Sequence, residues 1–104
     1  MARHILYVRS FVLELIKQGK KTLEVRPYGA FTAKISMDDV ISFNDFLERK
    51  VRAIRTYHDF HRLLKAEPAD KLWPRKTQAD ILCDLQEMYG VEATHILVFH
   101  LLPP

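Results

Sequence analysis

Side chains able to do chemistry are concentrated in residues 19–26, which read Gly-Lys-Lys-Thr-Leu-Glu-Val-Arg. Apolar and polar residues alternate in the second half of this stretch, as in a half-buried strand, so we expect Thr22, Glu24 and Arg26 on one face. Lys21 would lie at the bend before that strand. Two cations, one carboxylate and one hydroxyl would then lie close together, as in a site that binds an anion or transfers protons.

Three interpretations of this group are open. As a binding site, Lys21 and Arg26 would hold a phosphate or a nucleobase edge, while Glu24 orients them or accepts a hydrogen bond from an exocyclic amine. As a hydrolytic site, a lysine of lowered pKa would act as base or nucleophile, and the carboxylate would shuttle protons. As a structural feature, the three side chains would form a lattice of salt bridges without a ligand, because exposed ion pairs are common and contribute little stability.

Length and composition narrow the class of protein. The chain has 104 residues, of which 48% are hydrophobic and 28% charged, and we expect one domain over residues 1–104 with one modest core. No apolar run could span a bilayer, and the N-terminus lacks the core of a signal peptide, so we expect a cytoplasmic protein without a membrane partner. The net charge of +3 is compatible with a nucleic-acid partner but does not require one.

Cysteine and histidine usage gives no support for a metal site. Cys83 is the one cysteine, and the five histidines are scattered along the chain. An intrachain disulfide is therefore impossible, and no zinc cluster is indicated. We expect neither a metal nor a cofactor. The oligomeric state is left open.

The elements that must position the charged stretch alternate between strands and helices. Strands are predicted at residues 4–9, 22–26, 40–43, 50–56 and 94–102. Helices are predicted to begin at Ser10 as N-cap, at His58 or Asp59 and at Thr77, and to end at Gly19, Glu67-Pro68 and Gly90. The last strand is almost wholly apolar, which indicates burial on both of its faces. This alternation predicts the α+β class.

Aromatic and basic residues outside the charged stretch are further candidates for ligand contacts. Tyr28 and Phe31 would either pack over the barrel mouth or stack on a base. Trp73, in a predicted loop over residues 69–76, would either plug the end of the core or form a stacking wall. Arg49, Lys50, Arg52 and Arg55 make the fourth strand the most basic segment. This strand would be either a solvated edge protected by charge or a phosphate-facing patch that includes Arg55. Its alternation predicts that Val51, Ala53 and Arg55 share a face.

Several segments resemble motifs of the ASCH domain, a small relative of the RNA-binding PUA fold, and they follow one another along the chain in the order of that domain. The signature G-x-K-x-x-E-x-R is matched by Gly19, Lys21, Glu24 and Arg26. Residues 37–43 resemble its (P)GD-x-I-x-F motif, with Asp38 where glycine is usual, and residues 54–60 resemble its I-x-x-Y-x-s-F junction. A helix that ends in Tyr89-Gly90 before an apolar strand also fits. The resemblance implies a PUA-like small mixed β-barrel with about three helices packed around it and a cleft at one side.

The resemblance also implies what the cleft could do. ASCH domains are generally regarded as RNA-interacting, so the implied partner is RNA, a nucleoside or a nucleotide. Some small bacterial members are amidohydrolases that remove the acetyl group from N4-acetylcytidine with a lysine, a threonine and a glutamate. Only the lysine carries over, as Lys21, because Glu24 stands at the position of the threonine and Pro74 near that of the glutamate. Glu67 is a carboxylate that could approach from the preceding loop.

A second hydrolytic activity is implied by other ASCH proteins, which have been linked to RNA cleavage. For that chemistry Lys21, Arg26 and a nearby tyrosine would stabilise a pentacoordinate phosphate. The sequence offers no clear pair of histidines for it.

Overall fold

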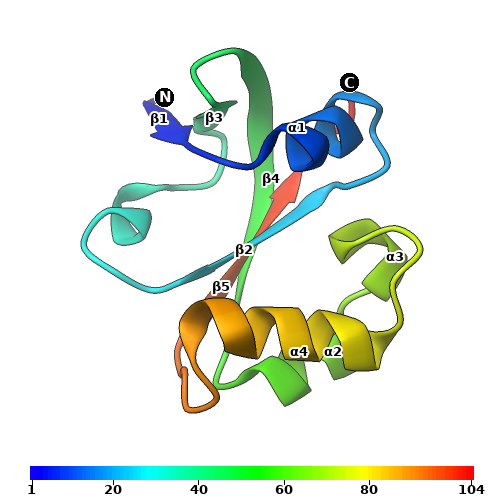
Figure 1. Cartoon of the computed structure of the whole chain (residues 1–104). Helices are drawn as coiled ribbons and strands as arrows, with labels where there is room; N and C mark the ends of the chain where they lie inside the picture. Colours follow the sequence, from blue (N-terminus) through cyan, green and yellow to red (C-terminus); the bar gives the residue numbers. More distant parts are fainter.

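Five strands form one mixed sheet, around which helices are packed (Figure 1). The computed structural model describes all residues, 1–104. The strands are β1 (Arg3–Leu6), β2 (Leu23–Pro27), β3 (Val40–Phe43), β4 (Leu47–Tyr57) and β5 (Ile96–Leu101). The helices are α1 (Ser10–Lys17), α2 (Phe60–Ala66), α3 (Ala69–Leu72) and α4 (Gln78–Tyr89), with a short 3-10 helix, η1 (Thr32–Lys34). None of the helices is long and apolar enough to cross a membrane.

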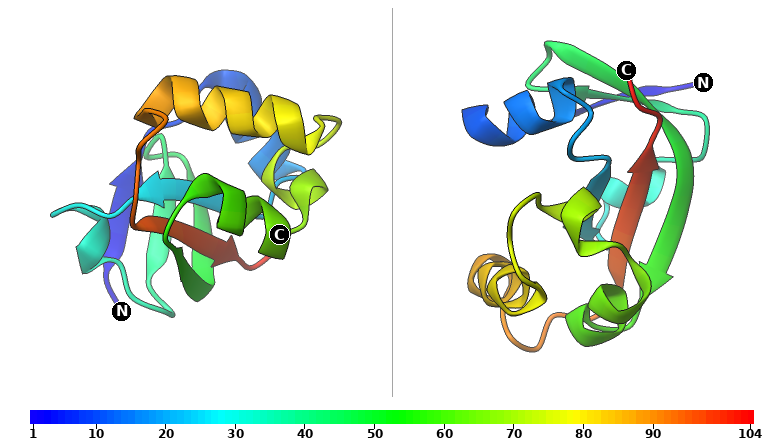
Figure 2. Two further views of the ribbon diagram at one scale, coloured as in Figure 1. Left: turned by 90° about the horizontal axis from the view of Figure 1, so that it is seen from below. Right: turned by 90° about the vertical axis from the view of Figure 1, so that its right-hand side faces the viewer.

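The sheet is strongly curved but does not close. Its strand order is β1-β3-β4-β5-β2, and only the β1–β3 pair is parallel. Because β1 and β2 are edges that do not pair with each other, the sheet is a half-barrel with an opening between them (Figure 2). The predicted α+β class is confirmed, and the expected small mixed β-barrel is present as a half-barrel, with four α-helices where about three were expected.

The central strand β5 divides the interior into two hydrophobic clusters. Leu97, Phe99 and Leu101 pack with α1 on one side of the sheet, while Ile96 and Val98 pack with α2, α3 and α4 on the other. Both sets are buried, which confirms the predicted burial of this strand on two faces. The helices are separated accordingly, with α1 at one end of the molecule and the other three at the opposite end (Figure 1).

Most helix boundaries follow the local signals. Asp59 and Thr77 are N-caps whose side chains each accept a hydrogen bond from the backbone N–H three residues later. Gly90 ends α4 with φ of +96°, a conformation that favours glycine. The predicted cap at Ser10 is wrong, because Ser10 is already helical and the cap position is Arg9, whose side chain makes no capping bond.

Three elements differ from the sequence-based prediction. β4 is longer than predicted, and a bulge between Val51 and Ala53 interrupts its pairing with β5. The extra residue reverses the alternation, so Val51 and Ile54, rather than Val51 and Ala53, pack into the same cluster. Residues 69–76 were predicted as a loop but contain α3. β1 also ends at Leu6 instead of continuing to residue 9.

Candidate functional site

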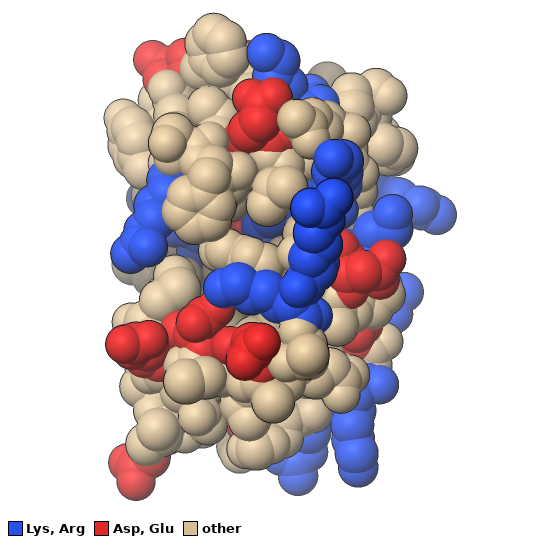
Figure 3. Space-filling model, turned by 45° about the vertical axis from the view of Figure 1, so that its right-hand side comes forward, with Lys and Arg blue, Asp and Glu red and all other residues tan.

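A cavity of about 370 Å³ lies at the opening of the half-barrel, within the size range of small-molecule sites. Figure 3 shows a hollow on this face, between the part of the molecule that carries α1 and the part that carries α4, with charged atoms at its base. The cavity is lined by Tyr7, Val8, Arg9, Val12, Lys21, Glu24, Val25, Arg26, Leu72, Trp73, Ile81, Leu85, Met88 and Tyr89. Most of these residues are apolar, and three of the four charged ones, Lys21, Glu24 and Arg26, belong to the wall formed by β2 and the bend before it.

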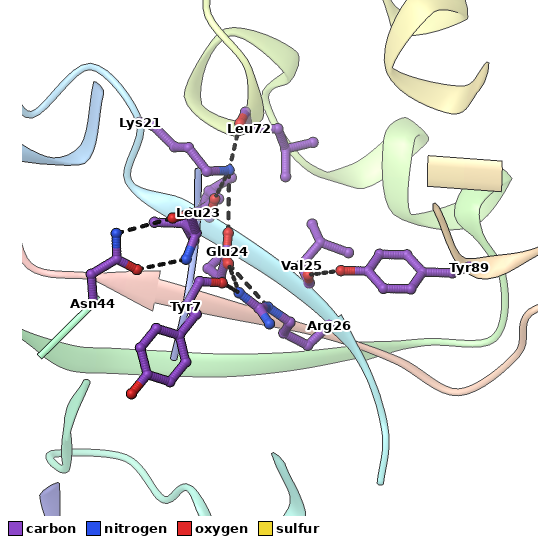
Figure 4. Close-up of polar contacts among 10 residues, drawn as sticks. Tyr7, Lys21, Leu23, Glu24, Val25, Arg26, Asn44, Leu72 and Tyr89 are labelled. Carbon is purple, nitrogen blue, oxygen red and sulfur yellow. Dashed lines mark hydrogen bonds and ion pairs between the residues drawn. The ribbon is translucent and has the colours of Figure 1, made fainter. Parts of the chain in front are cut away.

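Lys21 is buried at the base of this wall, with 4% of its surface exposed. Its Nζ donates to the carbonyl oxygens of Leu23 at 2.6 Å and Leu72 at 2.7 Å, and lies 3.5 Å from Oε1 of Glu24 (Figure 4). Burial lowers the pKa of Lys21, and the charge of Glu24 partly opposes this shift. The bend that turns Lys21 inward begins at Gly19, whose φ of +75° favours glycine.

Glu24 and Arg26 form the second part of the charged cluster. Oε2 of Glu24 accepts hydrogen bonds from Nε of Arg26 at 3.0 Å and from its Nη2 at 2.7 Å. Nη2 also donates to the carbonyl oxygen of Tyr7 at 3.0 Å, and this bond crosses the opening between the β2 edge and the segment after β1 (Figure 4). The ion pairs are therefore buried or half-buried, unlike the exposed pairs of the structural interpretation.

Trp73 forms a further part of the cavity wall. It packs against both hydrophobic clusters, and its ring meets that of Phe11 edge-on with 5.7 Å between centroids. The ammonium of Lys76 lies 4.4 Å from the ring centroid and that of Lys21 lies 5.7 Å from it, both within the range of cation–π attraction. Trp73 thus fills the end of the core, as the first interpretation predicted, and it also lines the cavity; its stacking on a ligand stays a prediction.

Several predicted site residues lie outside the cavity lining. Thr22 precedes β2, and its backbone N–H donates to the carbonyl oxygen of Lys71 in α3. It lines a shallow crevice together with Arg49. Tyr28 is exposed and stacks on His95 with 4.0 Å between ring centroids. Arg55 is exposed on β4, which is separated from β2 by β5. The structure therefore does not bring Thr22, Tyr28 and Arg55 into the cavity lining with Lys21, and contact of these three residues with a ligand stays a prediction.

Glu67 also lies elsewhere, in a separate buried cluster. Its Oε2 accepts a hydrogen bond from the Tyr57 hydroxyl at 2.6 Å and lies 3.1 Å from Nε2 of His100. Burial raises the pKa of Tyr57, and the hydrogen bond and charge of Glu67 raise it further. The prediction that Glu67 reaches the Lys21 site is wrong, because β4 and β5 hold this carboxylate at the end of α2. Glu24 is thus the single carboxylate in the lining of the cavity.

The sequence interpretation missed residues that approach the cluster from other elements. Tyr89 entered the sequence analysis only as the end of the last helix, yet its hydroxyl reaches the carbonyl oxygen of Val25 at 3.5 Å (Figure 4). Burial raises the pKa of Tyr89. Leu72 contributes a backbone carbonyl, which no side-chain pattern could indicate. Tyr7 and Arg9 lie in the predicted first strand but belong to the connection from β1 to α1.

Charges of both signs surround the mouth of the cavity. Basic side chains flank the hollow and acidic side chains lie below it, at the level of α4 (Figure 3). Asp80 and Asp84 belong to that helix, and Asp84 forms an ion pair with Lys76. The chain has no group of three or more His, Cys, Asp or Glu side chains placed to hold a metal ion.

Comparison with known proteins identifies one family and several similar solved structures. The ASCH domain model matches residues 6–100. The crystal structure of the hypothetical protein PH0355 has a TM-score of 0.88 and 26% identity, with 100% of both chains covered. The solution structure of PF0455 from Pyrococcus furiosus has a TM-score of 0.77 and 27% identity, over 97% of this chain and 96% of that one.

The third similar structure is a tyrosine-to-phenylalanine mutant of ZmASCH from Zymomonas mobilis, with a TM-score of 0.71. It is 13% identical and is matched over 97% of this chain and 69% of its own, so the similarity concerns the fold alone. No curated protein matches the chain.

Proposed function

Because the chain belongs to the ASCH domain family, we propose that it binds RNA or a nucleotide, and that one nucleobase enters the cavity beside β2. The observation that carries this proposal is the composition of the cavity wall. A mostly apolar pocket of about 370 Å³ contains one compact cluster of Lys21, Glu24 and Arg26. A planar heteroaromatic ring has the matching character, with apolar faces and a polar edge.

The bonding of the cluster favours a base over a phosphate at the bottom of the cavity. Lys21 already serves two carbonyl groups and Glu24, and Arg26 is held by Glu24 and Tyr7. A phosphate would have to compete with these internal acceptors and would lie next to the Glu24 carboxylate. The phosphates of a bound strand would instead remain at the rim, where Arg9 is exposed.

Trp73 provides a direct assay, because it is the only tryptophan of the chain and lines the cavity. We expect saturable changes in its fluorescence on titration with short single-stranded RNAs and with free nucleosides. Arg9→Gln should weaken RNA binding and reduce the slope of log affinity against log salt by about one. Arg55→Gln is the matched control, since both arginines are exposed but Arg55 lies outside the cavity lining.

The opposite pattern would contradict the proposal. If Arg55→Gln weakened RNA binding while Arg9→Gln did not, the basic segment of β4 would be the binding surface. If neither RNA nor nucleosides altered the fluorescence at any concentration, the cavity would not be a nucleotide site.

A hydrolase is the second candidate, favoured by the lowered pKa of Lys21 beside a carboxylate. In this scheme the neutral amine of Lys21 removes a proton from water, and the resulting hydroxide attacks the acetyl carbon of N4-acetylcytidine. The C–N bond breaks, Lys21 returns the proton to the leaving nitrogen, and acetate and cytidine are released. Chromatography should detect cytidine with the wild type and none with Lys21→Met. An absence of cytidine with the folded wild-type protein would refute this activity.

A further inference from the structure

The backbone of β2 has one side that faces away from the sheet, because β2 is an edge strand. Its hydrogen bonds to β5 can be assigned on either side of Val25. Leu101 N donates to Thr22 O at 2.9 Å, and Tyr28 N donates to His95 O at 2.8 Å. Since bonded and non-bonded pairs alternate in an antiparallel ladder, the N–H and C=O of Val25 point away from β5.

Two side chains confirm the direction of this free edge. Lys21 Nζ donates to the carbonyl oxygen of Leu23, and the hydroxyl of Tyr89 approaches the carbonyl oxygen of Val25 (Figure 4). Pro27 occupies the next outward-facing position, where a residue without an N–H leaves the ladder intact. The outward side of β2 therefore faces the cavity, which Lys21, Val25 and Tyr89 all line.

Val25 is the residue of this edge with both a donor and an acceptor still available. The carbonyl of Leu23 is occupied by Lys21 at 2.6 Å, and Pro27 has no N–H. The carbonyl of Val25 has one long contact, 3.5 Å, with Tyr89, and its N–H has no neighbouring strand. Buried backbone groups are almost always paired in folded proteins, so this pair of groups is ready for an external partner.

The molecule shows which chemistry fits such a pair of groups. The carboxamide of Asn44 bonds both backbone groups of Val8, which also lines the cavity. Val8 N donates to Oδ1 at 2.8 Å, and Nδ2 donates to Val8 O at 3.0 Å (Figure 4). A planar group with a donor and an acceptor two bonds apart therefore satisfies the N–H and C=O of a single residue.

We infer that the main chain of Val25 reads the ligand, and that the cavity selects ligands with adjacent donor and acceptor atoms on a planar edge. This inference rests on the proposed function and specifies its ligand class. Bases with an amino group beside a ring nitrogen, or an N–H beside a ring carbonyl, have such an edge. The Val25 N–H donates a hydrogen bond to the acceptor atom of the ligand. The donor of the ligand bonds the Val25 carbonyl oxygen, either in place of the Tyr89 hydroxyl or together with it.

The test compares ligands that differ only at this edge. Isothermal titration calorimetry would measure uridine against 3-methyluridine, and cytidine against N4,N4-dimethylcytidine, because each methylation removes the donor. We expect methylation to weaken binding about fivefold to tenfold, as for the loss of one hydrogen bond. In wild-type protein labelled with 15N, the Val25 amide signal should shift on binding of the parent nucleoside and its hydrogen exchange should slow.

A variant of the backbone gives a second test. Val25→Pro removes the N–H, and since that N–H points away from β5, the ladder is retained. Val25→Ala is the matched control, because it shortens the same side chain but keeps the N–H. We expect Val25→Pro to bind uridine about tenfold more weakly than Val25→Ala. If Val25→Pro does not fold, the comparison of parent and methylated nucleosides with the wild-type protein still tests the inference.

The outcomes separate this inference from the proposed function. Equal binding of parent and methylated nucleosides, or an unchanged Val25 amide signal in the bound protein, overturns the inference and leaves nucleotide binding intact. If no nucleoside and no RNA binds, both are overturned.

Discussion

Replacing Glu24 with glutamine tests the buried charge cluster most severely. The substitution preserves shape but removes the negative charge that holds Lys21 at 3.5 Å and Arg26 at 2.7 Å. The side chains of Lys21 and Glu24 are only 4% and 7% exposed, and that of Arg26 is 22% exposed. The variant would leave two cations close together without a counter-charge.

The size of the effect follows from this geometry. Two unit charges about 4 Å apart attract by about 4 kcal/mol at an effective dielectric constant of about 20. Returning the carboxylate to water in the unfolded state offsets part of the loss, and Arg26 can reorient toward solvent. We therefore expect Glu24→Gln to lower the free energy of unfolding by about 3 kcal/mol, at the lower end of the range for breaking a buried pair.

Urea denaturation of a double-mutant cycle measures this effect. The cycle consists of the wild type, Glu24→Gln, Lys21→Met and the double variant, all measured at pH 7. The m-value should be the same for all four proteins, so that differences in midpoint report differences in stability. We expect Lys21 and Glu24 to be coupled by at least about 1 kcal/mol, since the double variant no longer buries the lysine charge. A loss below about 0.5 kcal/mol for Glu24→Gln, of the size expected for a surface pair, would refute the reasoning.

Three further predictions concern stability. Burial lowers the pKa of Lys21 in the folded protein below 10.5. Between the folded and the unfolded pKa the unfolded chain binds more protons, so the free energy of unfolding should rise with pH there. Lys21→Met should lack this rise, and equal slopes of unfolding free energy against pH for the two proteins, measured by urea denaturation at pH 7 to 10, would contradict this. Gly19→Ala should lower the free energy of unfolding by about 1–2 kcal/mol, because φ is +75° and the added Cβ would lie 3.2 Å from Pro104; an unchanged melting temperature would contradict it. Glu67→Ala should lower the melting temperature, with a loss of about 2–3 kcal/mol, and leave nucleoside affinity unchanged in calorimetry, because Glu67 lies outside the cavity lining; weaker binding by the folded variant would place it in the site after all.

Short-range features of the fold were predictable from the sequence. The caps at Asp59 and Thr77 depend on a side chain and a backbone N–H three residues apart. The alternation in residues 22–26 correctly paired Glu24 with Arg26, because neighbours of one face in a strand are two residues apart. In each case the relevant partners lie within one turn of helix or one repeat of a strand.

The burial of Lys21 was not predictable, because it depends on distant partners. One of its acceptors is the carbonyl of Leu72, 51 residues later, and a backbone carbonyl leaves no trace in a side-chain pattern. Glu67 was misplaced for the same reason, since Tyr57 and His100 come from two different strands. The sequence could indicate that these residues are chemically capable but not which of them meet.

The apolar stripe of α4 shows a different limit of the sequence pattern. The spacing of its apolar residues is that of a core-facing stripe that includes Met88, yet Met88 is 60% exposed and lines the cavity. A helix that faces a cavity has the same apolar periodicity as one that faces a packed core. Periodicity therefore indicated the side of the helix that faces the half-barrel but could not reveal the cavity there.

Binding of a nucleobase at the free edge of β2 can be tested most directly by an NMR titration. Protein labelled with 15N would be titrated with a short single-stranded RNA while all amide and indole signals are followed. We predict that the largest shifts occur at Val25, at its neighbours in β2 and at the indole of Trp73. Shifts confined to residues 49–55 of β4, while the signals of Val25 and of the Trp73 indole do not move, would contradict this binding mode.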